Sequence, residues 1–153
     1  MEQTEFLPAE PLIPQRRLMK LIEWVTRPMR NGLLAKTTVA KGWPLKRDEM
    51  VDSLICIELV AQAIAALSTW HRGEGARPRV GLLVGIKDVE FFSSTIPVGT
   101  PLTIQIDEVY HVGEYAVFGG KVSSDSALVC KIIIQVMEPG EEIISNLMIR
   151  ETT

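Results

Sequence analysis

One acidic residue stands out because it lies within an otherwise apolar stretch. Between residues 54 and 67 every side chain is apolar except those of Glu58 and Gln62. Residues four apart in a helix share a face, so the Gln62 carboxamide is placed to hold the Glu58 carboxyl. A carboxylate in apolar surroundings is costly unless it is hydrogen-bonded or protonated. Glu58 is therefore either a catalytic acid or a structural acid bonded to Gln62 or to a partner chain, and the surroundings alone favour the structural role.

The helix that would carry both residues is predicted between residues 50 and 72. Asp48, Asp52 and Ser53 can each cap its first turn with a side-chain oxygen, and Gly73 supplies a C-terminal stop. A helix that is apolar all round is normally buried. The apolar run is shorter than the roughly 20 residues that a bilayer requires. We therefore expect this helix in the core of a soluble fold.

Length, charge and cysteine content limit the classes of function. The chain has 153 residues and a formal net charge of −3, without a run of basic residues, so we expect neither nucleic acid nor a membrane as partner. Cys56 and Cys130 lie in apolar segments and are interpreted as reduced core residues, and the N-terminus lacks the features of a signal peptide. We expect one cytoplasmic domain with a core from about residue 12 to about residue 138, a proline-rich N-terminal arm and a C-terminal tail.

Segments of alternating apolar residues predict the strands that surround the helix. They are residues 33–39, which follow the hairpin dipeptide Asn31-Gly32, and residues 80–92, 102–110, 115–122 and 128–136. The helix and a ten-residue strand would both be about 35 Å long, so a curled antiparallel sheet can enclose the helix. One sheet cannot cover all its sides, and a second copy is the natural lid. The pattern predicts an α+β hotdog fold, a long central helix wrapped by a curved antiparallel sheet, in a dimer; another α+β roll is the alternative.

Four short motifs together resemble those of 3-hydroxyacyl-ACP dehydratases of the FabA/FabZ type. The segment IELVAQA at residues 57–63 is similar to their helix motif, an acid followed by two apolar residues and Ala-Gln-Ala. The other segments are LIPQRRLM at 12–19, LLVGIKDVEF at 82–91 and PVG at 97–99, in the family's order and spacing. The resemblance covers residues 12–137 and is closest to the branch of aryl-polyene-type dehydratase-like proteins, which lacks the catalytic histidine.

The resemblance implies a site for acyl thioesters, carried by acyl carrier protein or by coenzyme A, and neither a metal nor a cofactor. It assigns the role of catalytic acid to Glu58 and the support of its carboxyl group to Gln62. It also implies that backbone N–H groups at the start of the helix bind the thioester, in the region of Ser53, Leu54 and Ile55.

The resemblance implies further substrate contacts at Gly85 and Phe91, on the strand that follows the helix. The alternative for the phenylalanine is an ordinary core position. Arg77, Arg79 and Lys87 are expected to be surface charges. They would suit an acidic carrier protein if they flank the entrance of the site.

The sequence departs from the family at a catalytic position. The family's histidine lies fourteen residues before the helix acid, where this chain has Pro44, and Gln15 replaces the histidine of the opening motif. Only His71 and His111 remain in the chain. His71 lies about 20 Å along the helix from Glu58, and His111 precedes a hairpin turn. Neither is expected to share a site with Glu58 of the same chain.

Three functions stay open, and all of them predict an acyl-thioester tunnel beside Glu58. The first is a dehydratase of fatty-acid, polyketide or aryl-polyene biosynthesis, which eliminates water from 3-hydroxyacyl thioesters with Glu58 and an unidentified base. The second is a non-catalytic hotdog subunit that pairs with an active dehydratase and can lend it the acid. The third is an acyl thioesterase that uses the acid and a bound water. The partner subunit is either a second copy or another hotdog protein.

Overall fold

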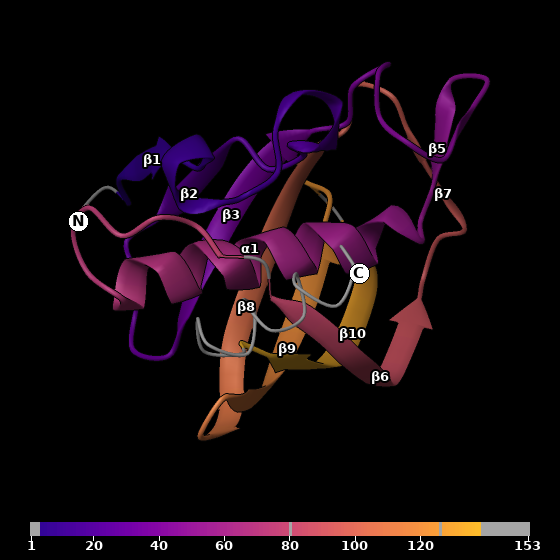
Figure 1. Ribbon diagram of the computed structural model, residues 1–153. Helices are drawn as coiled ribbons and strands as arrows, with labels where there is room; N and C mark the ends of the chain where they lie inside the picture. The colour runs from indigo at the N-terminus through magenta and orange to yellow at the C-terminus, as the bar shows by residue number, and fades with distance from the viewer. Residues whose placement is uncertain (1–3, 80, 126, 139–153) are drawn as a thin grey trace, which may run out of the picture.

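A seven-stranded antiparallel sheet curves around one long helix in the computed structural model, which describes residues 4–79, 81–125 and 127–138 (Figure 1). In spatial order the strands are β1 (Phe6–Pro8), β2 (Trp24–Thr26), β3 (Gly32–Thr38), β8 (Pro101–Val112), β9 (Tyr115–Ser123), β10 (Leu128–Met137) and β6 (Leu82–Phe91). A second sheet is formed by β4 (Lys46–Arg47), β5 (Met50–Asp52) and β7 (Thr95–Pro97). Two short 3-10 turns, η1 (Glu10–Leu12) and η2 (Arg17–Met19), lie between β1 and β2.

The predicted strands are confirmed with small shifts at their ends. The predicted C-terminal tail lies outside the described residues, as does Val80 at the start of one predicted strand. The first hairpin turn is one residue earlier than predicted, because Arg30 and Asn31 form it while Gly32 begins β3. Gly32 is needed in the strand since a Cβ atom there would lie 2.1 Å from the carbonyl oxygen of Ile106.

Helix α1 (Ile55–His71) is the predicted central helix, but it begins later than expected. The prediction that residues 50–52 are helical is wrong, because they pair with β7 as strand β5. The side chain of Asp52 accepts a hydrogen bond of 2.9 Å from the N–H of Leu54, the N-cap residue. The prediction that Asp48, Asp52 or Ser53 caps the first turn is wrong, because no side chain bonds the N–H groups of that turn. At the other end, Gly73 has a φ of 108° and stops the helix as predicted.

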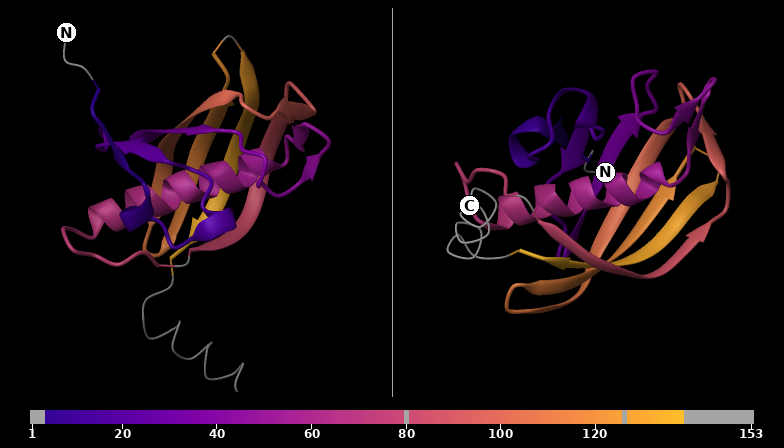
Figure 2. Two further views of the ribbon diagram at one scale, coloured as in Figure 1. Left: turned by 90° about the horizontal axis from the view of Figure 1, so that it is seen from above. Right: turned by 45° about the vertical axis from the view of Figure 1, so that its right-hand side comes forward.

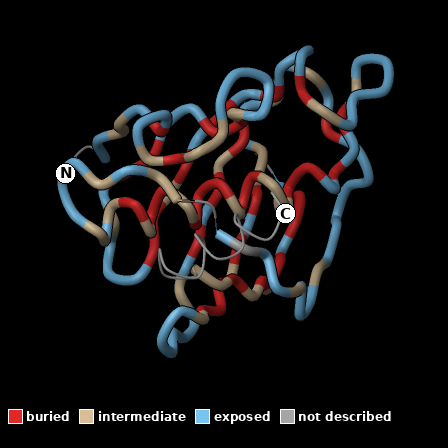
Figure 3. Tube along the Cα trace, in the orientation of Figure 1, coloured by how far each residue is buried: buried red, intermediate tan, exposed pale blue. Residues whose placement is uncertain are grey.

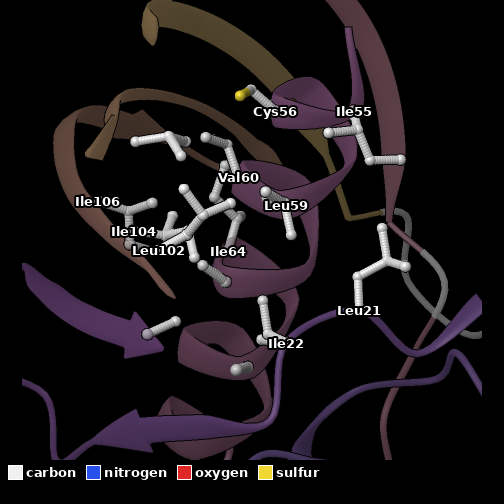
Figure 4. Packing of buried hydrophobic residues seen from close by; sticks show 14 of the residues in the cluster. Leu21, Ile22, Ile55, Cys56, Leu59, Val60, Ile64, Leu102, Ile104 and Ile106 are labelled. Atoms are coloured by element: carbon white, nitrogen blue, oxygen red, sulfur yellow. The ribbon is translucent and has the colours of Figure 1, made fainter. Parts of the chain in front are cut away.

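The core lies between α1 and the concave face of the sheet (Figures 2 and 3). Figure 4 shows side chains of α1 packed against those of β8, among them Val60 and Ile64 from the helix and Ile104 and Ile106 from the strand. The segment before β2 lies against α1 on the side away from β9 and β10 (Figure 2). The helix is therefore covered by the sheet on one side and by the N-terminal segment on another.

The two edges of the large sheet differ in length and polarity. The β1 edge has three residues and includes Pro8, which has no N–H to offer to another strand. The β6 edge has ten residues and, within the described chain, pairs only with β10. Large apolar side chains are exposed along it, namely Leu83, Val84, Ile86, Phe91 and the following Phe92. A long apolar edge is a template for pairing with another chain.

Candidate functional site

Glu58, in the first turn of α1, faces a pocket of about 170 Å³. The pocket lies between α1, the segment before η2, the start of β6 and the end of β10. It is lined by Pro14, Gln15, Ile57, Glu58, Ala61, Ile64, Ala65, Gly81, Leu83, Val136 and Glu138. The Glu58 side chain is half-buried in this largely apolar surrounding, so a ligand in the pocket can reach its carboxyl group.

Gln62 is fully buried and fixes the orientation of that carboxyl group. Its Nε2 donates hydrogen bonds to Glu58 Oε1 at 3.0 Å and to the Met19 carbonyl oxygen at 2.7 Å. Its Oε1 accepts the N–H groups of Leu21 at 2.9 Å and Ile22 at 3.2 Å. The carboxamide has used its two donor hydrogens and both acceptor positions. Gln62 therefore acts on Glu58 from within the protein and has no group left for a ligand.

Gln15 is a site residue that the sequence analysis did not include. Its Nε2 lies 3.4 Å from Glu58 Oε1, and its Oε1 is buried without a hydrogen-bond partner in the described chain. When Glu58 is ionised, the opposite orientation of the Gln15 amide would bring two oxygen atoms together. Glu58 Oε1 receives both amide donors, which leaves Oε2 for a ligand. The signal for Gln15 was its place at the histidine position of the opening motif.

The three residues expected to bind a thioester lie at the start of α1. The Ser53 N–H donates to the Ser94 carbonyl oxygen at 3.0 Å, and the Leu54 N–H donates to Asp52. The Ile55 N–H has no acceptor among the described residues and lies at the positive end of the helix dipole. The Ser53 hydroxyl is buried without a partner in the same part of the chain. None of the three residues lines the Glu58 pocket of the single chain.

Gly85 and Phe91 lie on β6, outside the Glu58 pocket of the single chain. A Cβ atom at Gly85 would lie 2.7 Å from Oε1 of Gln135, so the glycine lets that side chain cross the strand. Phe91 is exposed at the free edge. A contact of either residue with substrate would require a second subunit to extend the pocket.

The two histidines lie at a different place, as expected from their positions in the sequence. Both line a pocket of about 260 Å³ at the C-terminal end of α1, next to the β8–β9 hairpin. His111 Nδ1 lies 3.6 Å from Glu108 Oε1, and His71 is exposed. Neither lines the Glu58 pocket. Among the described residues, no group of His, Cys, Asp and Glu side chains has an arrangement that could hold a metal ion.

Cys56, in the first turn of α1, and Cys130, on β10, form a buried pair between the helix and the sheet. Both thiols are free and fully buried. A hydrogen bond to Cys130, together with burial, raises the pKa of Cys56. The Cys56 thiol is therefore protonated at neutral pH and has the properties of a core side chain, as predicted.

A family model described as ApeP-like, ApeP dehydratase, matches residues 7–147. No curated protein sequence matches the chain. Within the part of the chain described by the structure, no helix combines the length and the apolar character needed to cross a membrane.

Several solved structures share the fold. The dehydratase heterocomplex ApeI:P from Xenorhabdus doucetiae matches with a TM-score of 0.82 and 24% identity over 94% of this chain and 99% of that chain. An uncharacterized protein, PH1136 from Pyrococcus horikoshii, has a TM-score of 0.64 at 12% identity over 90% of this chain and 98% of its own. A hypothetical thioesterase with coenzyme A from Streptococcus pneumoniae has a TM-score of 0.59 at 15% identity, over 76% of this chain and 84% of that chain. At these identities the structures establish the hotdog fold alone.

Proposed function

The chain belongs to the family of ApeP-like dehydratases, and from that premise we propose that it is the acid-bearing subunit of a 3-hydroxyacyl-thioester dehydratase. Its histidine would come from a second hotdog subunit. The substrate class is acyl thioesters on acyl carrier protein, of the kind used in aryl-polyene biosynthesis. The observation that carries the proposal is the Glu58 carboxyl, oriented by two glutamines in a pocket without a histidine.

The chemistry of dehydration assigns a role to each group. A base removes the C2 proton, the electrons of that C–H bond form the C2–C3 double bond, and the C3–O bond breaks. The Glu58 carboxyl gives its proton to the departing hydroxyl, which leaves as water. The imidazole of the second subunit takes the C2 proton. Gln62 keeps the Glu58 carboxyl turned toward the pocket, and the Ile55 N–H is available for the charge that develops on the thioester oxygen.

The free β6 edge of the sheet is evidence for a second subunit beside this site. Gly81 and Leu83, at the start of β6, line the Glu58 pocket. A chain that pairs with β6 would thus lie beside the pocket and cover the exposed apolar side chains of the edge. The similar ApeI:P structure is a heterocomplex. A heterocomplex formed through the β6 edge of this chain would bring a side chain of the partner close to the Glu58 pocket.

The test is a dehydration assay on the assembled complex. The full chain is purified together with the histidine-bearing hotdog subunit of the same cell and incubated with 3-hydroxyoctanoyl carrier protein. Mass spectrometry of the carrier measures the loss of water. We expect enoyl product from the complex, and a strong loss of product with either Glu58→Gln in this chain or replacement of the partner's histidine.

Two outcomes would contradict the proposal. If the complex forms product at the same rate with Glu58→Gln, the acid of this chain has no part in the reaction. If free thiol appears instead of enoyl product, the chain is a thioesterase in which Glu58 activates water, an alternative that the same pocket geometry permits.

A further inference from the structure

A short basic turn directly follows Pro14 and Gln15, which line the Glu58 pocket. It consists of Arg16, Arg17, Leu18, Met19 and Lys20 and includes η2. Leu18 Cδ2 lies 3.3 Å from the position of a Cβ on Gly42, which brings the neighbouring Lys41 to the same surface. Residues 13–22 and 39–43 contain these four cations and no acid, whereas the whole chain has a net charge of −3. These four cations thus form a local positive cluster in a chain whose net charge is negative.

The basic turn is also apolar and accessible. Leu18 is 70% exposed and Met19 is 50% exposed. Among the residues that the structure describes, no acidic side chain forms an ion pair with any of the four cations. Exposed apolar side chains surrounded by positive charges are typical of a surface that binds an acidic protein.

The basic turn is attached to the site by hydrogen bonds at both ends. Before it, Gln15 lines the pocket and donates to Glu58. At its end, the Met19 carbonyl accepts from Gln62, whose oxygen holds the next backbone N–H groups. A molecule bound on the basic turn would thus lie next to Gln15, which both lines the pocket and contacts the Glu58 carboxyl.

We infer that the basic turn is the docking surface for the acidic carrier protein that delivers the acyl thioester. This inference rests on the proposed function. Arg77, Arg79 and Lys87, which were expected to be surface charges, would suit the carrier only if they flanked the entrance of the site. Lys87 lies on the β6 edge next to Asp88, where a second subunit would cover it. The acyl arm of a carrier docked on the basic turn would enter the pocket past Gln15.

The test compares ligands that differ only in what carries the acyl group. Octanoyl carrier protein, octanoyl-pantetheine and octanoyl-CoA are titrated calorimetrically into the full chain in its purified complex, at low and at moderate salt. We expect the double variant Arg17→Glu, Lys20→Glu to bind the carrier at least about tenfold more weakly at low salt, with a smaller difference at moderate salt. Its affinity for octanoyl-pantetheine should equal that of the unmodified chain.

The control is an equal change of charge on another face. Lys121 and Lys131 are exposed cross-strand neighbours on β9 and β10, on the sheet surface turned away from α1. The double variant Lys121→Glu, Lys131→Glu should bind all three ligands like the unmodified chain. If it weakens carrier binding as much as the turn variant does, net charge is responsible and the docking surface is not the basic turn.

The remaining outcomes separate the docking surface from the proposed function. If the turn variant binds all three ligands more weakly, the turn maintains the pocket and the inference is overturned. If it loses octanoyl-CoA alone, the cations hold a phosphate group and the inference is again overturned. If the unmodified chain binds octanoyl-pantetheine but not the carrier, the inferred docking surface is contradicted, while the acyl-binding pocket is supported. If it binds none of the ligands, the proposed function fails first.

Discussion

Gln62 donates a hydrogen bond of 3.0 Å to Glu58, one helical turn before it, while its other donor and its oxygen hold the backbone of the N-terminal segment. The same side chain thus orients the carboxyl group and ties residues 19–22 to α1. Gln15 contributes the second amide donor to Glu58 but keeps its own oxygen unpaired. Replacing the two glutamines should therefore lower the free energy of unfolding by different amounts.

Replacement of Gln62 by methionine should destabilise the fold, while the same change at Gln15 should not. Gln62→Met leaves the buried N–H groups of Leu21 and Ile22 without an acceptor, and each costs about 1–3 kcal/mol. We expect a loss of about 3 kcal/mol in the free energy of unfolding, measured in urea. Gln15→Met removes an oxygen that is already unpaired and should stay within about 1 kcal/mol of the unmodified chain. Equal losses would show that Gln62 is not the tie between the segments.

Replacement of Glu58 by glutamine should abolish most of the dehydration by the complex. Glutamine keeps the shape and accepts the same hydrogen bonds but has no acidic proton, so we expect the rate to fall by about 10²–10⁴. The control is Glu23→Gln, the same change at an exposed acid before β2. A rate within about twofold of the unmodified complex for Glu58→Gln would exclude a general-acid role.

Much of the fold could be predicted because its signals are local. The apolar run around Glu58, the Gly73 stop and the alternation in the last three long strands each depend on neighbouring residues. The second sheet could not be predicted in this way, because β5 pairs with β7 more than 40 residues later in the chain. That pairing outweighed the helical pattern at residues 50–52 and moved the start of α1.

The candidate site was only half predictable for a similar reason. The pair Glu58 and Gln62 follows from helical spacing, which the sequence displays directly. The bond between Gln15 and Glu58 spans 43 residues and depends on how the N-terminal segment folds back over α1. The contacts of Gly85 and Phe91 depend on a second chain, and a single sequence carries no pattern for them.

An arginine on the β6 edge should weaken the association of subunits. Val84 is an exposed apolar residue of this edge, and a charge there opposes burial against another chain. We expect Val84→Arg to reduce the mass measured by light scattering toward the 17.0 kDa of a single chain. Val109→Arg is the matched control, because Val109 is exposed on β8, away from this edge. An unchanged mass with Val84→Arg would place the subunit contact elsewhere.

The buried cysteine pair should resist alkylation in the folded protein. Cys56 is buried and forms a hydrogen bond to Cys130. Both effects raise the pKa of Cys56, which keeps its thiol protonated. Since the thiolate is the reactive form, iodoacetamide at pH 8 should label Cys56 only as fast as the chain unfolds. Adding urea should accelerate labelling, as detected by mass spectrometry. Labelling of the native chain at the rate of a small free thiol would contradict the burial of this pair.

The packing between the sheet and α1 can be tested at Gly119 and Gly120, two adjacent glycines of β9. A Cβ atom at Gly120 would lie 2.8 Å from Cγ1 and Cγ2 of Val60, and 3.1 Å from Cγ2 of Ile132. Both neighbours are branched and fully or almost fully buried, so they have little room to move. Gly120→Ala should therefore push α1 from the sheet and cost about 1–3 kcal/mol in the free energy of unfolding.

Gly119 provides the control because its side faces the opposite surface of the same strand. A Cβ atom there would approach no other atom closer than 4.0 Å, which is an ordinary contact. Gly119→Ala also removes the flexibility of a glycine from the unfolded chain, so its stability should be equal or slightly higher. Because Val60 lies two residues after Glu58 on α1, Gly120→Ala should also lower dehydration in the complex, whereas Gly119→Ala should leave it unchanged. If both variants are equally stable and active, the helix does not depend on the glycine for its approach to the sheet.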